Sequence, residues 1–252
     1  MSAAGAQVAL GVHRLGSDRV NFYLVEDEGR VTIVDAGVSG YWDQVEPALA
    51  QVGRDLDDVA AVVLTHAHSD HTGVAGKLHE RGRSMGVPVY LHPADHELLK
   101  TGKESWKREG SALSVLRHPR VFGFFAHMAR NGALRPPHIA DPVSIVHDDR
   151  LDVPGNPRVI HTPGHTPGHC ALHFERHGAL FVGDLLCTWH PVLGRRGPQI
   201  MPAAFNVSSA QALESLARIE DLSAGVVLPG HGEPWTSGPA DAVAQAREVG
   251  PS

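Results

Sequence analysis

Residues 61–73 read Ala-Val-Val-Leu-Thr-His-Ala-His-Ser-Asp-His-Thr-Gly and contain the most informative pattern in the chain. The apolar run 61–64 predicts a buried strand, and apolar residues at helical spacing then predict a helix over 72–81. Between them lie three histidines and an aspartate within six residues: His66, His68, Asp70 and His71. The polar cluster is therefore expected on a loop at the carboxyl end of a strand, where sites in α/β sheets commonly collect.

The side chains of this cluster are costly to pack together without a cation. Buried polar groups need partners, and protonated imidazoles repel one another at low pH. His66 and His68 are spaced closely enough to hold one cation, which leaves Asp70 and His71 to face another direction. We therefore interpret the stretch as metal-binding. The alternative is a solvated polar loop before a helix, and it does not explain why similar residues recur downstream.

The composition bounds the class of protein. The chain has 252 residues, of which 42% are hydrophobic and 20% charged, which is enough for one large α/β domain with a substantial core. We expect a single domain spanning residues 1–252. The net charge of −6 argues against a broad nucleic-acid-binding face.

Location and partners are predicted from what the sequence lacks. No apolar run reaches the roughly 18 residues of a membrane span, and no signal-peptide pattern is evident. Cys170 and Cys187 form no disulfide framework and fit a reducing compartment. We expect a cytoplasmic protein, a monomer or homodimer, that acts on a small molecule and binds neither membranes nor nucleic acid.

Most of the remaining chain alternates between strand and helix patterns. Strands are expected over 7–14, 20–26, 31–34, 87–91, 143–147, 151–153, 158–161, 170–175, 179–182 and 225–228. Helices are expected over 42–52, 208–217 and 241–248. Asp35 directly follows one strand. It is either a plain strand-end residue or a carboxylate that orients a ligand histidine, and both interpretations stay open.

The segment 93–141 departs from this alternation. Pro93 and Asp95 are suited to start a short helix, because proline fits the first turn and the acid complements the helix dipole. Three of the seven phenylalanines then lie within four residues, among many basic side chains. The segment is either a helical hairpin packed on the domain or a helical cap whose aromatic face lines a substrate pocket. We favour the cap because the segment lies between two groups of candidate ligands.

Three further candidate ligands each follow a short apolar strand: His165, Asp184 and His231. Together with the first cluster they make five histidines and two aspartates, which suit two divalent cations. Zinc is the metal we expect, with iron or manganese as alternatives. Neither cysteine occupies a ligand position, so a sulfur-rich structural zinc site is disfavoured and open positions for water are expected.

The motif His66-Ala-His68-Ser-Asp70-His71, with the later Gly-His165, Gly-Asp184 and Gly-His231 pairs, resembles the metallo-β-lactamase superfamily of hydrolases. The resemblance extends from Asp35 to His231 but does not explain 93–141. It implies an αββα sandwich with the metal site at one edge of two packed sheets. It also implies the ligands of two ions: His66, His68 and His165 on the first, Asp70, His71 and His231 on the second, and Asp184 bridging both.

The resemblance further implies a hydrolase that uses a metal-bridging hydroxide as nucleophile, while a metal polarises the carbonyl under attack. Asp70 would orient the hydroxide and carry a proton to the leaving group. Dedicated β-lactamases of the family usually carry cysteine or serine at the position of Asp184. We therefore expect cleavage of a small ester, thioester or lactone. The alternatives are β-lactam hydrolysis and an oxidoreductase resembling the mononuclear iron persulfide dioxygenases.

Two other histidines are candidates for supporting roles. His169 lies four residues beyond His165 and is placed to hydrogen-bond a ligand. His190 follows Trp189 and is a candidate to protonate the leaving group if it faces the pocket. For both residues a packing role is the favoured interpretation.

Overall fold

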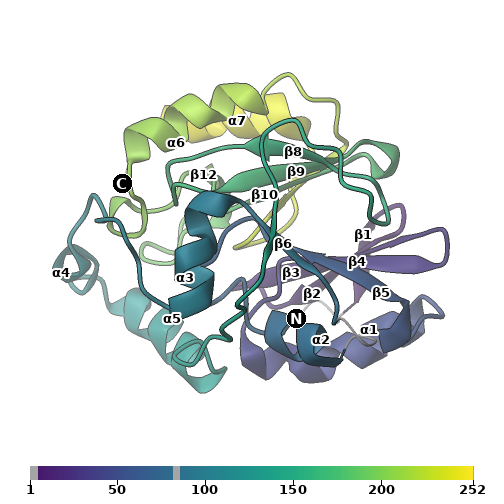
Figure 1. Cartoon of the computed structure of the whole chain (residues 1–252). Coiled ribbons are helices and arrows are strands. Elements are labelled where there is room, and N and C mark those ends of the chain that lie inside the picture. Colours follow the sequence, from purple (N-terminus) through teal and green to yellow (C-terminus); the bar gives the residue numbers. More distant parts are fainter. Residues whose placement is uncertain (1–4, 82–85, 252) are drawn as a thin grey trace.

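Two β-sheets pack face to face in the computed structural model, which describes residues 5–81 and 86–251 (Figure 1). The first sheet has seven strands in chain order: β1 (Ala6–Ala9), β2 (Val12–Gly16), β3 (Asn21–Asp27), β4 (Arg30–Val34), β5 (Val59–Val63), β6 (Val89–Leu91) and β7 (Val143–Ser144). The second has the order β13 (Val226–Pro229), β10 (Ala179–Gly183), β9 (Cys170–Phe174) and β8 (Arg158–His161). A separate ribbon pairs β11 (Cys187–Trp189) with β12 (Arg196–Gln199).

Helices cover the outer faces of both sheets. Figure 1 shows α1 (Val45–Gln51) and α2 (Ala75–Arg81) on the outside of the first sheet, and α6 (Ser209–Ser215) and α7 (Gly238–Val249) outside the second. Three more helices lie within 93–141: α3 (His96–Thr101), α4 (Ala112–Val115) and α5 (Pro119–Arg130). This arrangement confirms the αββα sandwich. No helix among the described residues is long and apolar enough to cross a membrane.

Short 3₁₀-helices occupy several connections: η1 (Ser39–Gln44), η2 (Leu56–Asp58), η3 (Pro93–Asp95), η4 (Glu175–His177), η5 (Ala203–Phe205) and η6 (Leu216–Arg218). Local chemistry sets several helix ends. Ser208 accepts a hydrogen bond from the backbone N–H of Gln211 and so caps α6. Gly102 ends α3 with φ +70°, a left-handed conformation that glycine adopts without steric cost.

The expected strands differ from the structure in four places. Of the range 143–147 only Val143–Ser144 forms a strand. The range 7–14 contains two strands, because Gly11 at φ +67° turns the chain between β1 and β2. The range 151–153 forms no strand, although Arg150 makes one isolated bridge to Arg158. The ribbon of β11 and β12 was not predicted, because its short strands carry no alternating pattern.

Parallel pairing brings the candidate ligand loops to one edge. In the first sheet β4 runs parallel to β5 with Val34 opposite Val63, so the residues that follow both strands emerge together. In the second sheet β10 runs parallel to β13 with Gly183 opposite Pro229, so Asp184 and His231 also emerge together. Stacking the sheets places the two pairs of strand ends at the same edge.

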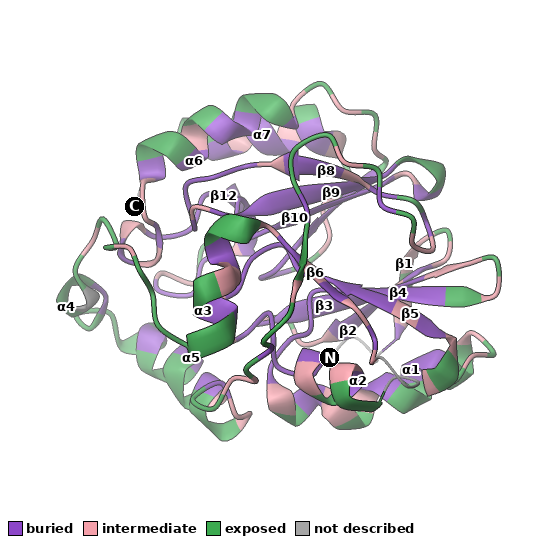
Figure 2. Ribbon diagram, viewed as in Figure 1, coloured by how far each residue is buried: buried purple, intermediate pink, exposed green. Residues whose placement is uncertain are grey.

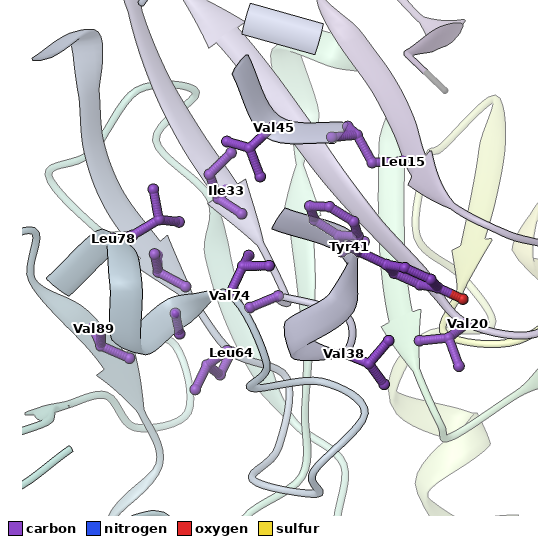
Figure 3. Close-up of a cluster of buried hydrophobic side chains, with 14 of the residues drawn as sticks. Leu15, Val20, Ile33, Val38, Tyr41, Val45, Leu64, Val74, Leu78 and Val89 are labelled. Carbon is purple, nitrogen blue, oxygen red and sulfur yellow. The ribbon is translucent and has the colours of Figure 1, made fainter. Parts of the chain in front are cut away.

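The core fixes this edge from both sides. Figure 3 shows Ile33 of β4 and Leu64, which directly follows β5, in one buried cluster with Val74 and with Leu78 of α2. Figure 2 shows the central strands of both sheets buried, whereas the outer helices keep an exposed side. Burial of such side chains contributes about 1.5–3 kcal/mol each, so the strand ends are rigidly held.

The loop after β5 docks closely against the loop after β4. The N–H of Ala36 donates to the carbonyl of His71 (2.7 Å), and the N–H of Gly73 donates to the carbonyl of Gly37 (2.8 Å). A Cβ atom at residue 73 would lie 2.1 Å from the carbonyl carbon of Val38, so only glycine allows this approach. The position of the candidate ligand loop therefore depends on Gly73.

Gly73→Ala is expected to lower the free energy of unfolding by about 1–3 kcal/mol, because the two loop backbones must separate. Urea denaturation followed by circular dichroism measures the change. Gly123→Ala in α5 is the matched control: its added Cβ meets no atom within 4 Å, and alanine favours the helix by up to about 1 kcal/mol. An unchanged stability for Gly73→Ala would contradict this account of the loop.

Candidate metal centre

Seven side chains from four loops converge at the edge of the sandwich. The loop after β5 contributes His66, His68, Asp70 and His71, and the other three residues are His165 before β9, Asp184 after β10 and His231 after β13. All are buried except His68, which is partly exposed. The structure therefore brings together all seven residues that the sequence singled out.

The first group of donors consists of His66, His68 and His165, whose candidate ligand atoms lie within 4.8 Å of one another. His68 Nδ1 lies 2.8 Å from His165 Nε2. The rings of His66 and His165 are nearly perpendicular, with centroids 4.7 Å apart. The three imidazoles thus face a common point.

The second group consists of Asp70, His71 and His231. Asp70 Oδ2 lies 3.5 Å from His231 Nε2 and 3.9 Å from His71 Nε2. Asp184 lies between the two groups: its Oδ2 is 3.3 Å from His165 Nε2, and its Oδ1 is 3.4 Å from His71 Nε2. One carboxylate therefore contacts both groups.

Four of the five imidazoles are oriented through Nδ1 by partners outside the cluster. The acceptors are Thr65 Oγ1 for His66 (3.0 Å), Asp35 Oδ2 for His71 (2.9 Å), Asn206 Oδ1 for His165 (3.0 Å) and the Arg19 carbonyl for His231. A Nδ1–H that donates outward leaves the Nε2 lone pair facing the cluster. His68 is the exception and turns Nδ1 inward.

Asp35 has the orienting position that the sequence left open. Besides His71, its carboxylate accepts hydrogen bonds from the backbone N–H and the hydroxyl of Thr65. Its backbone has φ +55°, an uncommon conformation for a residue other than glycine. The contacts favour the orienting interpretation over a plain strand-end residue.

The cluster fits a divalent cation. Three of its buried atoms have no hydrogen-bond partner among the described residues: His66 Nε2, His71 Nε2 and Asp184 Oδ1. An unsatisfied buried polar atom costs about 1–3 kcal/mol, and a cation at this point would satisfy all three. Imidazole nitrogens with carboxylate oxygens are the donors that zinc and related metals prefer.

Burial and charge set the protonation of the cluster. Burial holds the pKa of His66 and of His165 well below the usual range, so both are neutral. Burial also acts to lower the pKa of His71 and His231, but the Asp184 carboxylate and its neighbours outweigh it and raise both. Burial acts to raise the pKa of Asp184, and these two imidazoles hold it well below its usual range. A cation bound to the second group would displace protons from these imidazoles, so its binding is expected to weaken as the pH falls.

His169 contacts a candidate ligand, whereas His190 packs away from the cavity. His169 Nε2 accepts from the backbone N–H of Asp184 (3.1 Å), and its Nδ1 hydrogen-bonds the hydroxyl of Thr162 (2.9 Å). Burial lowers the pKa of His169 to about 3, so it stays neutral and positions Asp184.

His190 Nδ1 accepts from the N–H groups of Val192 and Leu193, and His190 does not line the cavity beside the cluster. The packing interpretation of His190 is favoured.

A cavity of about 590 Å³ opens beside the cluster, with His68, Asp70, His165, Asp184 and His231 in its wall. Most of the other lining residues are apolar and come from 98–137: Leu98, Leu99, Phe124, Phe125, Met128, Ala133, Leu134, Pro136 and Pro137. The segment 93–141 thus supplies much of the apolar wall next to the candidate centre.

Asp95 is a structural residue that the sequence analysis missed. It was expected only to favour a helix start, but its buried carboxylate accepts from Ala67 N–H (3.2 Å), Thr166 Oγ1 (2.7 Å) and Gly168 N–H (2.8 Å). These bonds tie the loop of His66 to the loop of His165. No local pattern reveals the role, because the partners in the second loop are more than 70 residues away.

Comparison with known proteins agrees with this geometry. The family model for the metallo-beta-lactamase superfamily matches residues 15–231. The probable metallo-hydrolase YflN of Bacillus subtilis is 28% identical over 248 residues, which cover 93% of this chain and 89% of the relative. The crystal structure of the metallo-beta-lactamase family protein TTHA1429 from Thermus thermophilus has a TM-score of 0.65 at 26% identity and covers 96% of this chain and 79% of that one. TTHA1623, solved in a di-iron-bound form, has a TM-score of 0.59 at 29% identity, covering 88% and 92%.

Asp95→Asn is expected to lower the free energy of unfolding by about 2–3 kcal/mol, because an amide nitrogen replaces one acceptor and faces backbone donors. Chemical denaturation measures the loss, and Asp152→Asn, at an exposed position, is the control that leaves stability unchanged. If Asp95→Asn matched the control, the carboxylate would not hold the two loops together.

Proposed function

This chain belongs to the metallo-beta-lactamase superfamily, as its motif predicted, and we propose that it is a hydrolase that cleaves a small ester, thioester or lactone with two bound divalent cations. Several similar proteins of Bacillus subtilis carry the name probable metallo-hydrolase, which supports metal-dependent chemistry. The observation that carries the proposal is the pair of donor groups that share Asp184 and open into an apolar cavity.

Two cations are proposed because two of the donor groups have no residue in common, and a third group, His66, His71 and Asp184, joins them. A mononuclear site of the persulfide dioxygenase type uses two histidines and an aspartate, whereas seven donors are gathered here. We propose zinc, which suits imidazole and carboxylate ligands without sulfur. Iron is the first alternative, since the similar protein TTHA1623 was solved with two iron ions, and manganese is the second.

When bound, such cations lower the pKa of water to near neutrality and polarise the bond under attack. The residues of the chain hold and orient what reacts. Asp70 lines the cavity and is proposed to accept the proton of the attacking water at a carboxylate oxygen and pass it to the leaving group. Asp35 and Asn206 keep His71 and His165 turned towards the centre, and their loss would let the rings rotate.

The substrate class follows from the cavity. Its volume of about 590 Å³ lies within the range of small-molecule sites, and its aromatic and aliphatic wall suits an acyl chain or lactone ring. The apolar side chains of this wall offer water no hydrogen-bond partners, so the reaction is proposed to take place at the end that meets the cluster. The segment 93–141 is proposed to act as the helical cap over this cavity.

Elemental analysis combined with a substrate screen tests the proposal. We expect about two metal ions per chain and turnover of aryl esters, acyl-thioesters or homoserine lactones, lost on chelation and restored by zinc. One iron per chain with oxygen consumption would instead indicate the persulfide dioxygenase class. Turnover of only a cephalosporin reporter would indicate a β-lactam hydrolase, and turnover of only a phosphodiester would overturn the substrate class.

His68→Ala is expected to lose bound metal and to lower hydrolysis by more than about a hundredfold, because removing even an outer partner of a ligand costs ten- to hundredfold. Metal content, initial rates and thermal unfolding are measured on the same preparation, with His118→Ala, at an exposed position, as the matched control. Full metal content and full activity in His68→Ala would refute the ligand assignment.

A further inference from the structure

We propose that Arg108 binds a negatively charged group of the substrate, so that the preferred substrates are apolar acyl compounds with an anionic group a few atoms from the bond that is cleaved. This inference rests on the proposed hydrolase function and specifies its substrate. Four features of the structure support it.

The first feature is the place of Arg108 in the cavity. It is the one arginine or lysine among the described residues that line the cavity. Its Nη2 lies 3.5 Å from Nε2 of His68, whose Nδ1 faces His165 on the other side of the ring. A single imidazole therefore separates the guanidinium from the cluster, and an anion bound to Arg108 must lie close to the reacting bond.

The second feature is the set of donors that Arg108 has available. Its Nε donates to Glu104 Oε2 (3.1 Å) and its Nη2 donates to Glu104 Oε1, which fixes the plane of the guanidinium. The two N–H groups of Nη1 have no hydrogen-bond partner among the described residues, and the side chain is 34% exposed. A guanidinium with free donors binds carboxylate, sulfonate or phosphate oxygens with defined geometry.

The third feature is the charge of the surrounding segment. Residues 100–135 contain eight arginines and lysines but two glutamates, whereas the whole chain has a net charge of −6. This segment thus contributes a positive field near the cavity of a protein whose net charge is negative. Such a field raises the local concentration of anions and speeds their association.

The fourth feature is the apolar lining of the same cavity. Phe124, Phe125 and Met128 offer an apolar surface without a second cation, which suits the hydrocarbon part of an amphiphilic anion. A purely structural role explains Arg108 less well. Glu104 Oε1 also lies 3.6 Å from His68 Nε2, but a partly exposed ion pair outside a helix contributes no more than about 1 kcal/mol and leaves Nη1 of Arg108 unused.

A matched pair of chromogenic esters tests the inference. One is the octanoyl ester of a nitrophenol that carries a ring carboxylate, and the other carries a ring carboxamide in the same position. We expect the metal-loaded protein to prefer the carboxylate ester in kcat/KM by about tenfold or more. Arg108→Gln is expected to lower kcat/KM for that ester by about ten- to hundredfold and to change the carboxamide ester by less than about threefold.

Two further variants serve as controls. Arg117→Gln removes the same charge from the same segment at an exposed position away from the cavity, and it is expected to keep the preference. Arg108→Lys keeps the charge without the planar fork and is expected to retain part of the preference. Hydrolysis of the carboxamide ester by each variant verifies that it is folded.

Equilibrium binding separates this inference from the proposed hydrolase function. The probe is the amide-linked analogue of the carboxylate ester, titrated by calorimetry into the wild-type protein and Arg108→Gln. If neither ester is hydrolysed but the analogue binds in an Arg108-dependent way, the hydrolase proposal fails and the anion site stands. If both esters are hydrolysed equally, or Arg108→Gln keeps the preference, the anion site is overturned and the hydrolase proposal stands.

Discussion

The candidate centre depends on two parallel strand pairings, one in each sheet. The pairing of β4 with β5 places Asp35 beside Thr65 and His66, and the pairing of β10 with β13 places Asp184 beside Gly230 and His231. Each donor therefore continues from a buried strand whose position is fixed by the core. Because the two sheets stack face to face, the distance between the donors of the first sheet and those of the second is fixed as well. Long flexible loops are therefore not needed to assemble the site.

Burying this many polar groups is unfavourable unless each finds a partner, and the surroundings of the cluster supply most of them. Asp35 holds His71, Asn206 holds His165, and Asp95 ties their two loops together. The atoms still without partners, His66 Nε2, His71 Nε2 and Asp184 Oδ1, lie at the centre. A cation that binds there adds its binding free energy to the stability of the folded chain, because the unfolded chain has no such site.

The sequence predicted the features that depend on neighbouring residues, and it did not reveal the contacts between residues far apart in the chain. The strand, the ligand loop and the helix around His66 follow from residue type and spacing, and the sandwich follows from the family resemblance. Asp95 and Asn206 were not identified, since a carboxylate at a helix start and an asparagine in a loop have many ordinary roles. Their importance arises from partners 71 and 41 residues away. The sequence left the role of Asp35 open for the same reason, because its contact with His71 joins residues 36 positions apart.

The architecture separates the candidate chemistry from substrate selection. The segment 93–141 connects β6 to β7, which are neighbouring parallel strands, so its helices lie outside the two sheets and lean over their common edge. It supplies Arg108 and Phe124 to the cavity but none of the seven candidate donors, and Asp95 at its start anchors it to both ligand loops. Changes in the cavity wall can therefore alter which molecule fits without moving the donors, as expected of a fold whose members share one site and differ in substrate.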